Sequence, residues 1–160
     1  MAWSPPEAPR YKINYDATTF AEDSKVGLGV LIRNSAGLVM ALLTQQIPLP
    51  ATVIEIEALA AQRVMELALE IGLANIVLDG DNKTLFEALN SGDRNLAQHG
   101  HLIKDILFLS SYCSAFTVSF ICGQCNKLAH SLARKAKSLP FIIIWMEDVP
   151  QILYQSFRLT

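Results

Sequence analysis

The sequence predicts a single α/β domain in which a mixed sheet carries helices on its faces. Three segments with strand character come first, at residues 11–17, 26–34 and 38–45. Helical and strand patterns then alternate as far as about residue 137. Neighbouring strands joined by short turns pair antiparallel, whereas strands joined through helices pair parallel, so both kinds of pairing are expected in one sheet.

Length and composition limit the class of protein. The chain has 160 residues, of which 51% are hydrophobic, so it is long enough for one folded domain and too apolar for a disordered one. The formal net charge of −2 lacks the basic excess of a dedicated nucleic-acid grip. Apolar runs stay below the roughly 18 residues of a membrane span. We therefore expect a globular intracellular protein, nuclear or cytoplasmic, with no membrane partner.

The first half of the chain predicts a meander of three strands. Residues 1–10 are a proline-rich lead-in, which we expect to be extended and exposed. Polar and apolar residues then alternate from Tyr11 to Asp16, which is the last member of the polar row. The turn sequence NSAG at residues 34–37 joins the second and third strands into a hairpin.

A long amphipathic helix follows, and it places one acid on its apolar side. Thr52 is the expected N-cap, Glu55 completes a capping box, and Gly72 ends the helix. At 100° per residue, Glu57 lies within the apolar stripe and Glu55 faces solvent. Burying a lone carboxylate is costly unless it is neutralised, paired or bound to a metal ion, and no basic residue lies on this face of the helix. We therefore expect Glu57 to belong to a charged site.

The second half of the chain alternates strands and helices. We expect strands at residues 74–79 and 115–123, and helices after Asp81, at residues 101–112 and at residues 126–137. The apolar segment at residues 141–146 predicts a buried strand or a packed tail. This gives a lead-in at residues 1–10, a domain at residues 11–139 and a C-terminal tail at residues 140–160.

Three carboxylates, far apart in the sequence, are predicted to meet. Asp16 ends the first strand, Glu57 faces the sheet, and Asp81 follows the fourth strand. A helical crossover would make the first and fourth strands neighbours. Clustered like charges repel and raise one another's pKa, so such a cluster requires a cation, and oxygen ligands favour Mg²⁺ or Mn²⁺.

Each of these residues also has a purely structural interpretation. Asp16 is compatible with a turn at a strand end, and Asp81 with a helix N-cap. His130 is compatible with a packed or surface histidine on the last helix. Asp79 competes with Asp81, because a side chain two residues earlier in a strand points to the same face. The residues alone leave these alternatives open.

The three cysteines are Cys113, Cys122 and Cys125. Their odd number and the absence of a secretory signal favour reduced thiols. The single Cys-x-x-Cys pair is a weak zinc signal. A redox function is disfavoured, because the motif does not open a helix after a thioredoxin-type strand.

Several motifs, in order, resemble one known family. They are WSPPEAPRYKINYDA, VGLGVLIRNSAG, IEALAA, LDGDNKTLFEAL and NKLAHSLARKA, followed by Trp145 and Pro150. Their order and spacing resemble the plant ribonuclease H-like domain, also called the reverse-transcriptase-like domain. That domain occurs in small stand-alone proteins and at the end of retroelement polyproteins.

The resemblance implies a ribonuclease H-like fold, with a five-stranded mixed sheet whose first three strands are antiparallel and which is flanked by helices. It implies an endonuclease that hydrolyses the RNA strand of RNA–DNA hybrids, acting as a monomer with two Mg²⁺ or Mn²⁺ ions. The implied catalytic and metal-binding residues are Asp16, Glu57, Asp81 and His130. The resemblance selects Asp81 over Asp79. The expected nucleic-acid contacts are Asn14, Thr18 and Asn126.

Two departures from the family pattern support an alternative. His130 stands where many members have a fourth carboxylate, so a second ion would be held more weakly. The loop CGQCN lacks the family's Arg-Glu pair, which removes a potential phosphate contact. The alternative is a nucleic-acid-binding or scaffolding module of the same fold with little or no catalytic turnover.

Overall fold

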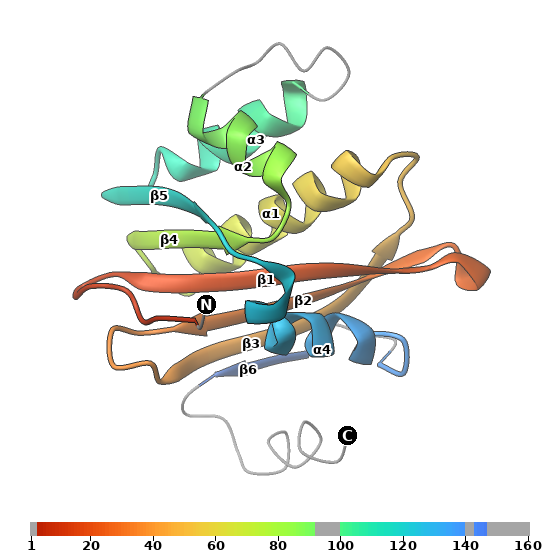
Figure 1. Cartoon of the computed structure of the whole chain (residues 1–160), viewed down its shortest axis with the longest axis horizontal. Coiled ribbons are helices and arrows are strands. Elements are labelled where there is room, and N and C mark those ends of the chain that lie inside the picture. The colour runs from red at the N-terminus through yellow and green to blue at the C-terminus, as the bar shows by residue number, and fades with distance from the viewer. Residues whose placement is uncertain (1–2, 92–99, 140–142, 147–160) are drawn as a thin grey trace.

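The computed structural model describes residues 3–91, 100–139 and 143–146. Its strands lie in one sheet with the order β5-β4-β1-β2-β3-β6 (Figure 1). The elements are β1 (Tyr11–Phe20), η1 (Ala21–Asp23), β2 (Lys25–Arg33), β3 (Val39–Pro48), α1 (Val53–Glu70), β4 (Asn75–Gly80), α2 (Lys83–Ser91), α3 (Gly100–Ser110), β5 (Ala115–Phe120), η2 (Gly123–Cys125), α4 (Lys127–Lys135) and β6 (Ile143–Met146).

The sheet confirms the predicted ribonuclease H-like architecture. β1, β2 and β3 form an antiparallel meander, while β4 and β5 add to the free side of β1 in parallel. The connection from β3 through α1 to β4 brings the chain back beside β1, as expected for a helical crossover. β1 therefore lies at the junction of the antiparallel and parallel halves.

A sixth strand extends the five that the sequence predicts. β6 pairs antiparallel with β3, with Ala41 opposite Met146 and Thr44 opposite Ile143. The apolar segment that predicted a strand or a packed tail thus contributes an edge strand. The rest of the tail expected at residues 140–160 lies outside the described residues.

The first strand is longer than the sequence indicates. β1 continues to Phe20, because Thr18 and Phe20 still pair with Gly27 and Lys25 of β2. The expectation that Asp16 ends the strand is therefore wrong, and Asp16 lies within it. Backbone pairing with a neighbour, rather than local propensity, sets where this strand ends.

Helices cover both faces of the sheet. Alternate residues of β2, such as Leu28 and Val30, join one buried cluster with apolar residues of α1, α2 and α3. The intervening residues, including Gly27 and Gly29, face α4 on the other side. Among the described residues, no helix is both long and apolar enough to cross a membrane.

α1 begins and ends as its sequence predicts. Thr52 has extended backbone angles, and its hydroxyl accepts a hydrogen bond from the Glu55 amide at 3.3 Å. The Glu55 carboxylate in turn accepts from the Ala51 amide at 3.3 Å. Gly72 follows the helix with φ of +84°, the left-handed conformation in which glycine is favoured.

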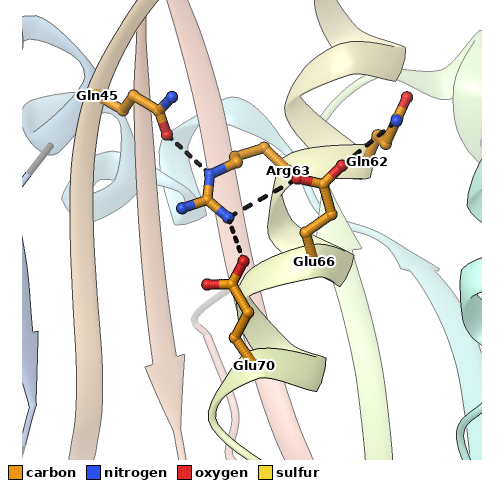
Figure 2. Close-up of polar contacts among 5 residues, drawn as sticks. All are labelled: Gln45, Gln62, Arg63, Glu66 and Glu70. Carbon is orange, nitrogen blue, oxygen red and sulfur yellow. Dashed lines mark hydrogen bonds and ion pairs between the residues drawn. The ribbon is translucent and has the colours of Figure 1, made fainter.

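Arg63 connects α1 to the sheet (Figure 2). Its Nε donates to Oε1 of Gln45 on β3 at 2.8 Å. Its Nη1 lies 3.4 Å from Oε1 of Glu70 and 3.8 Å from Oε2 of Glu66. The guanidinium thus bridges two carboxylates of α1 and an amide of β3, which orients the helix against the strand.

α4 rests on two glycines of β2. A Cβ at Gly29 would lie 2.2 Å from the Ala129 carbonyl oxygen, and one at Gly27 would lie 2.1 Å from that of Ala133. The helix backbone therefore occupies the space that a side chain would fill. Leu128, the residue before Ala129, is 57% exposed.

The lead-in is anchored to the sheet rather than fully exposed. Pro6 is buried, and the Trp3 ring lies between two cations, 4.0 Å from the Arg33 guanidinium carbon and 5.5 Å from Lys12 Nζ. Cation–π contacts of this kind hold an N-terminal segment in place without a strand pairing.

Candidate active site

Three carboxylates converge beside the centre of the sheet. Asp16 comes from β1, Glu57 from the first turns of α1, and Asp81 from the residue after β4. One oxygen of each lies within 4.8 Å of the others. They meet because β1 and β4 are parallel neighbours and α1 is the crossover between them. The predicted convergence of the three acids is therefore present in the fold. These three residues are called the acidic cluster below.

Glu57 is the least compensated member of the acidic cluster. Its Oε2 atom is buried and has no hydrogen-bond partner among the described residues. Burial, followed by the charges of Asp81 and Asp16, raises the pKa of Glu57 to about 8. The helix wheel placed Glu57 on the side of α1 where neighbours such as Ala61 and Val64 are buried, and the structure agrees.

Asp81 is held in a similar electrostatic environment. Burial and the neighbouring Asp16 raise its pKa, while a hydrogen bond from the Asn126 side chain and the nearby His130 oppose that rise. Its competing structural interpretation does not apply, because Oδ1 of Asn82 accepts the Leu85 amide at 2.8 Å and so caps α2. The Asp81 carboxylate does not cap the helix and instead lies close to Asp16 and Glu57.

Asp79 lies outside the acidic cluster. It is 2% exposed, and its carboxylate accepts a hydrogen bond from Asn14 Nδ2 at 3.1 Å and another from the Ser119 hydroxyl. These contacts link β4 to both of its neighbouring strands. The hydrogen bonds of the Asp79 carboxylate are therefore made within the sheet, whereas the Asp81 carboxylate lies among the other acids.

His130 projects from α4 onto the acidic cluster. Its Nδ1 lies 2.7 Å from Oδ2 of Asp16, and its side chain is about half exposed. The Gly29 contact explains the approach, because Gly29 pairs with Asp16 and carries the α4 backbone close above it. Sequence reasoning missed Gly29, although glycines within a strand signal a close backbone approach.

The residues expected to contact nucleic acid lie mostly inside the protein. Asn14 is 1% exposed and bonds to Asp79, and Asn126 is 2% exposed and donates to the Tyr15 carbonyl oxygen at 2.8 Å. The Thr18 hydroxyl is also buried. Their positions argue against direct contact for Asn14 and Asn126, and indicate that both support the strands carrying the acids.

Tyr15 forms the floor beneath the acidic cluster, and no pattern in the sequence indicated this. Its ring lies against Gly80, where a Cβ would come within 2.6 Å of the phenolic oxygen. Burial, then the charges of Glu57, Asp81 and Asp16, raise the Tyr15 pKa well above its ordinary value. A neutral phenol therefore separates the acidic cluster from the core.

The acidic cluster fits a hard divalent cation. Its donors are carboxylate oxygens, which Mg²⁺ and Mn²⁺ prefer over the nitrogen and sulfur donors typical of zinc sites. The partnerless Glu57 oxygen and the mutual repulsion of the three acids are both features that a bound cation would relieve.

Comparison with known proteins agrees with this architecture. The sequence model of the reverse transcriptase-like family matches residues 14–136. No curated protein matches the chain.

Solved structures show the same fold at low sequence identity. The RNase H1 of the halophilic archaeon Halobacterium salinarum NRC-1 is 20% identical with a TM-score of 0.72, over 81% of this chain and 98% of its own. The N-terminal RNase H domain of a Mycobacterium tuberculosis protein is 19% identical with a TM-score of 0.69, over 81% and 94%. LC11-RNase H1, isolated from compost and solved with an RNA/DNA hybrid, is 17% identical with a TM-score of 0.69, over 81% and 99%.

Proposed function

Because the chain belongs to the reverse transcriptase-like family, we propose that it is a ribonuclease H-type endonuclease that hydrolyses the RNA strand of RNA–DNA hybrids. The observation that carries the proposal is the acidic cluster, which has one oxygen of each acid within 4.8 Å of the others and in which Oε2 of Glu57 is buried without a partner among the described residues. The choice of substrate is supported by LC11-RNase H1, a structural relative that was solved in complex with an RNA/DNA hybrid.

The acidic cluster would hold the divalent cations. Asp16, Glu57 and Asp81 would supply the oxygen ligands, and the His130 imidazole lies beside Asp16. The chemistry that two bound Mg²⁺ or Mn²⁺ ions would supply there is a lower pKa of the attacking water and stabilisation of the departing 3′ oxygen. Asp16 lies within β1 opposite Gly29 of β2, two residues beyond Asn14, where the pairing of β1 with β4 ends.

The surrounding residues would orient the acids. Asn126 bonds to the Tyr15 carbonyl oxygen and to Asp81, which ties the start of α4 to β1 and to the end of β4. Asn14 and Asp79 cross-link β1 and β4 two residues before Asp16 and Asp81. Both contacts fix the separation of the strands that carry the acids, which preorganises the site.

The finer assignments belong to the same proposal. The motifs around Trp3 and Asn126 resemble plant members of the family, so we include a plant or plant-retroelement source. A hybrid substrate implies action in the nucleus or cytoplasm, and we expect the protein to work as a monomer. We also retain the division into residues 1–10, 11–139 and 140–160.

Cleavage of a labelled RNA–DNA hybrid tests the function. Purified protein is incubated with hybrid and Mg²⁺ or Mn²⁺, alongside Asp16→Asn and the exposed control Glu87→Gln. We expect RNA cleavage by wild type and Glu87→Gln, and at least about a 100-fold loss in Asp16→Asn, because an electrostatic or metal contact is worth several kcal/mol in such sites. Equal cleavage by wild type and Asp16→Asn would point to a contaminating nuclease and reject the proposal.

A second candidate is a binding module of the same fold. His130 favours it, because the half-exposed imidazole supplies no negative charge to hold a cation, whereas a fourth carboxylate would. Hybrid retained in a gel shift by wild type, with no cleavage at any Mg²⁺ or Mn²⁺ concentration, would select this candidate over the endonuclease.

A further inference from the structure

Two cysteines face each other in the turn between β5 and α4. Cys122 immediately precedes η2, and Cys125 is its last residue. Their sulfurs are 3.2 Å apart. The Cys125 amide donates to the Cys122 carbonyl oxygen at 2.9 Å, which closes the turn. The sequence pattern disfavoured a redox function, because the motif was not expected to open a helix after a strand. In the fold it begins two residues after Phe120, the last residue of β5, and ends two residues before Lys127, the first residue of α4.

The turn brings the two sulfurs to a separation that a bond can close. A disulfide bond is about 2.05 Å long, so side-chain rotation needs to shorten the present separation by only about one ångström. The backbone hydrogen bond already fixes the distance between the two residues. Cys122 is exposed and Cys125 is partly exposed, so a small oxidant can reach the pair.

We propose that Cys122 and Cys125 are a redox-active dithiol, which low-molecular-weight disulfides of the glutathione class convert into an intramolecular disulfide in the η2 turn. This inference concerns a modification site and does not depend on nuclease activity. Cys122 is the attacking residue, because it is the more exposed of the two. The hydrogen bond between the two thiols also lowers the pKa of Cys122, which favours its thiolate.

The exchange is balanced in two steps. The Cys122 thiolate attacks one sulfur of glutathione disulfide, the sulfur–sulfur bond of that molecule breaks, and one glutathione thiolate leaves. The Cys125 sulfur then attacks Sγ of Cys122 and releases the second glutathione. The two protons lost by the cysteines end on the two glutathione thiols, so the protein is oxidised by two electrons and one glutathione disulfide is reduced.

The third cysteine provides an internal reference. Cys113 is partly buried, and burial raises its pKa, which disfavours its thiolate. We therefore expect Cys113 to react more slowly than Cys122 under the same conditions.

The turn also forms one wall of the acidic cluster. A Cβ at Gly123 would lie 3.8 Å from Oδ2 of Asp81, and Asn126, the residue after Cys125, bonds to Tyr15 beneath the cluster. We therefore expect the disulfide to change how the cluster responds to divalent cations. This consequence, unlike the dithiol itself, rests on the proposed function.

Thiol counting by mass spectrometry tests the dithiol. The full chain carrying Cys113→Ser is equilibrated in glutathione buffers of increasing oxidising ratio, quenched in acid and alkylated. We expect Cys122 and Cys125 to lose reactivity together, with a mass two hydrogens lower and without a stable glutathione adduct. Adding Cys125→Ser removes the resolving sulfur, so one glutathione should then remain attached to Cys122. Adding Cys122→Ser is the matched control and should give much less adduct.

Two outcomes would overturn the dithiol. One is that both cysteines remain fully alkylated in the most oxidising buffer. The other is that glutathione adducts accumulate equally with and without Cys125. The unsubstituted chain is measured in parallel, so that a folding defect in a variant cannot decide the result.

Melting in Mg²⁺ tests the coupling to the acidic cluster. The Mg²⁺ concentration that gives half of the rise in Tm is measured for the reduced and the oxidised chain. We expect the two concentrations to differ by about threefold or more. Superimposable titrations would overturn the coupling while the thiol count still decides the dithiol. A Tm that does not change with Mg²⁺ concentration in either the reduced or the oxidised chain would count against the proposed cation site.

Discussion

Glu57 has a carboxyl group whose ionised form its surroundings do not compensate. Its position on α1 is fixed by helix periodicity and by apolar neighbours such as Ala61, which is fully buried. Neither Asp16 nor Asp81 can balance it, because both are acids. The fold therefore holds a destabilising group in place, which is characteristic of a site that functions with a bound partner.

Replacing Glu57 with glutamine should stabilise the cation-free protein. The pKa of Glu57 is about 8 in the folded chain, against an ordinary 4.5, so the folded state keeps the proton to higher pH than the unfolded state does. The contribution of Glu57 to stability is then highest below pH 4.5, falls as pH rises to about 8, and levels off above that. Glu57→Gln removes this loss, so its advantage should grow from about zero at pH 4.5 to about 4 kcal/mol at pH 8, because each unit of difference in pKa is worth about 1.4 kcal/mol.

Urea unfolding in EDTA at several pH values measures this effect. Glu87→Gln is the control, because Glu87 is exposed and pairs only loosely with Lys83 at 3.8 Å. An advantage for Glu57→Gln that is independent of pH would contradict the pKa argument. A loss of stability at pH 8 would show that the Glu57 carboxylate is compensated in solution.

Replacing His130 with aspartate should strengthen the response to cations. The new carboxylate would stand near Asp16, where the imidazole nitrogen is now 2.7 Å from Oδ2. A fourth negative charge attracts a divalent cation but repels the acidic cluster when none is bound. We expect a lower Tm in EDTA, and a Mg²⁺ concentration for half-maximal stabilisation that falls by about three- to tenfold. His130→Asn separates the effect of charge from that of shape, and an equal shift in both variants would contradict the argument.

At the scale of residues, the sequence was informative where a side chain conflicts with its pattern. Glu57 was predicted because an acid on an apolar stripe requires an explanation. The choice between Asp79 and Asp81 could not be made from strand alternation, because both point to the same face. Only the hydrogen bonds from Asn14 and Ser119 show that Asp79 is satisfied internally. The burial of Asn126 was also not predictable, because it depends on how α4 docks.

At the scale of elements, the glycine pair in β2 controls where α4 lies. Gly29→Ala would place a Cβ 2.2 Å from the Ala129 carbonyl oxygen, so the helix must move away from the sheet. We expect a loss of about 2–3 kcal/mol in the free energy of unfolding, measured with denaturant. Gly123→Ala is the control, because its Cβ would meet no atom nearer than 3.8 Å, and it should change stability by less than about 0.5 kcal/mol.

Gly29→Ala should also disturb the acidic cluster, through His130. If α4 shifts, the imidazole loses its contact with Asp16, which NMR can follow through the ring proton shifts of His130. Gly29→Ala with wild-type stability and unchanged His130 resonances would mean that α4 does not rest on β2 as described.

The positions of elements were predictable and their ends were less so. α1 was bounded correctly, because Thr52 and Gly72 are local signals. β1 and β3 run several residues further than their alternation indicates, to Phe20 and Pro48, because each continues to pair with β2. The edge position of β6 depends on a neighbour about a hundred residues earlier in the chain, which no local pattern reports.

At the scale of the whole molecule, the central domain should fold without the C-terminal segment. A chain ending at residue 139 loses β6 and leaves the Ala41–Thr44 side of β3 unpaired. We expect it to remain folded but to be less stable by about 1–2 kcal/mol, and to self-associate with rising concentration through the open edge. Thermal melting and size-exclusion chromatography measure the two effects. A truncated chain with no cooperative transition would show that the domain includes the tail.

The fold class and strand order were predictable as a whole, because the order of elements leaves few topologies. A meander followed by helical crossovers requires β4 to lie beside β1 or at the far edge of β3. The convergence of Asp16 with Asp81 follows if β4 lies beside β1, as it does in the structure. The electrostatics of the assembled site could not be predicted from the sequence. The raised pKa of Tyr15, for example, depends on burial and on acids from other parts of the chain.

The central position of β1 determines how ligand binding spreads through the molecule. The first part of β1, residues 11–14, pairs with β4, and most of the strand pairs with β2, so the amide protons where the two pairings overlap are protected from exchange with deuterium by fraying at an edge. They exchange only when the sheet itself separates. A cation held by Asp16 would therefore slow deuterium uptake in strands on both sides of β1, far beyond the residues it touches.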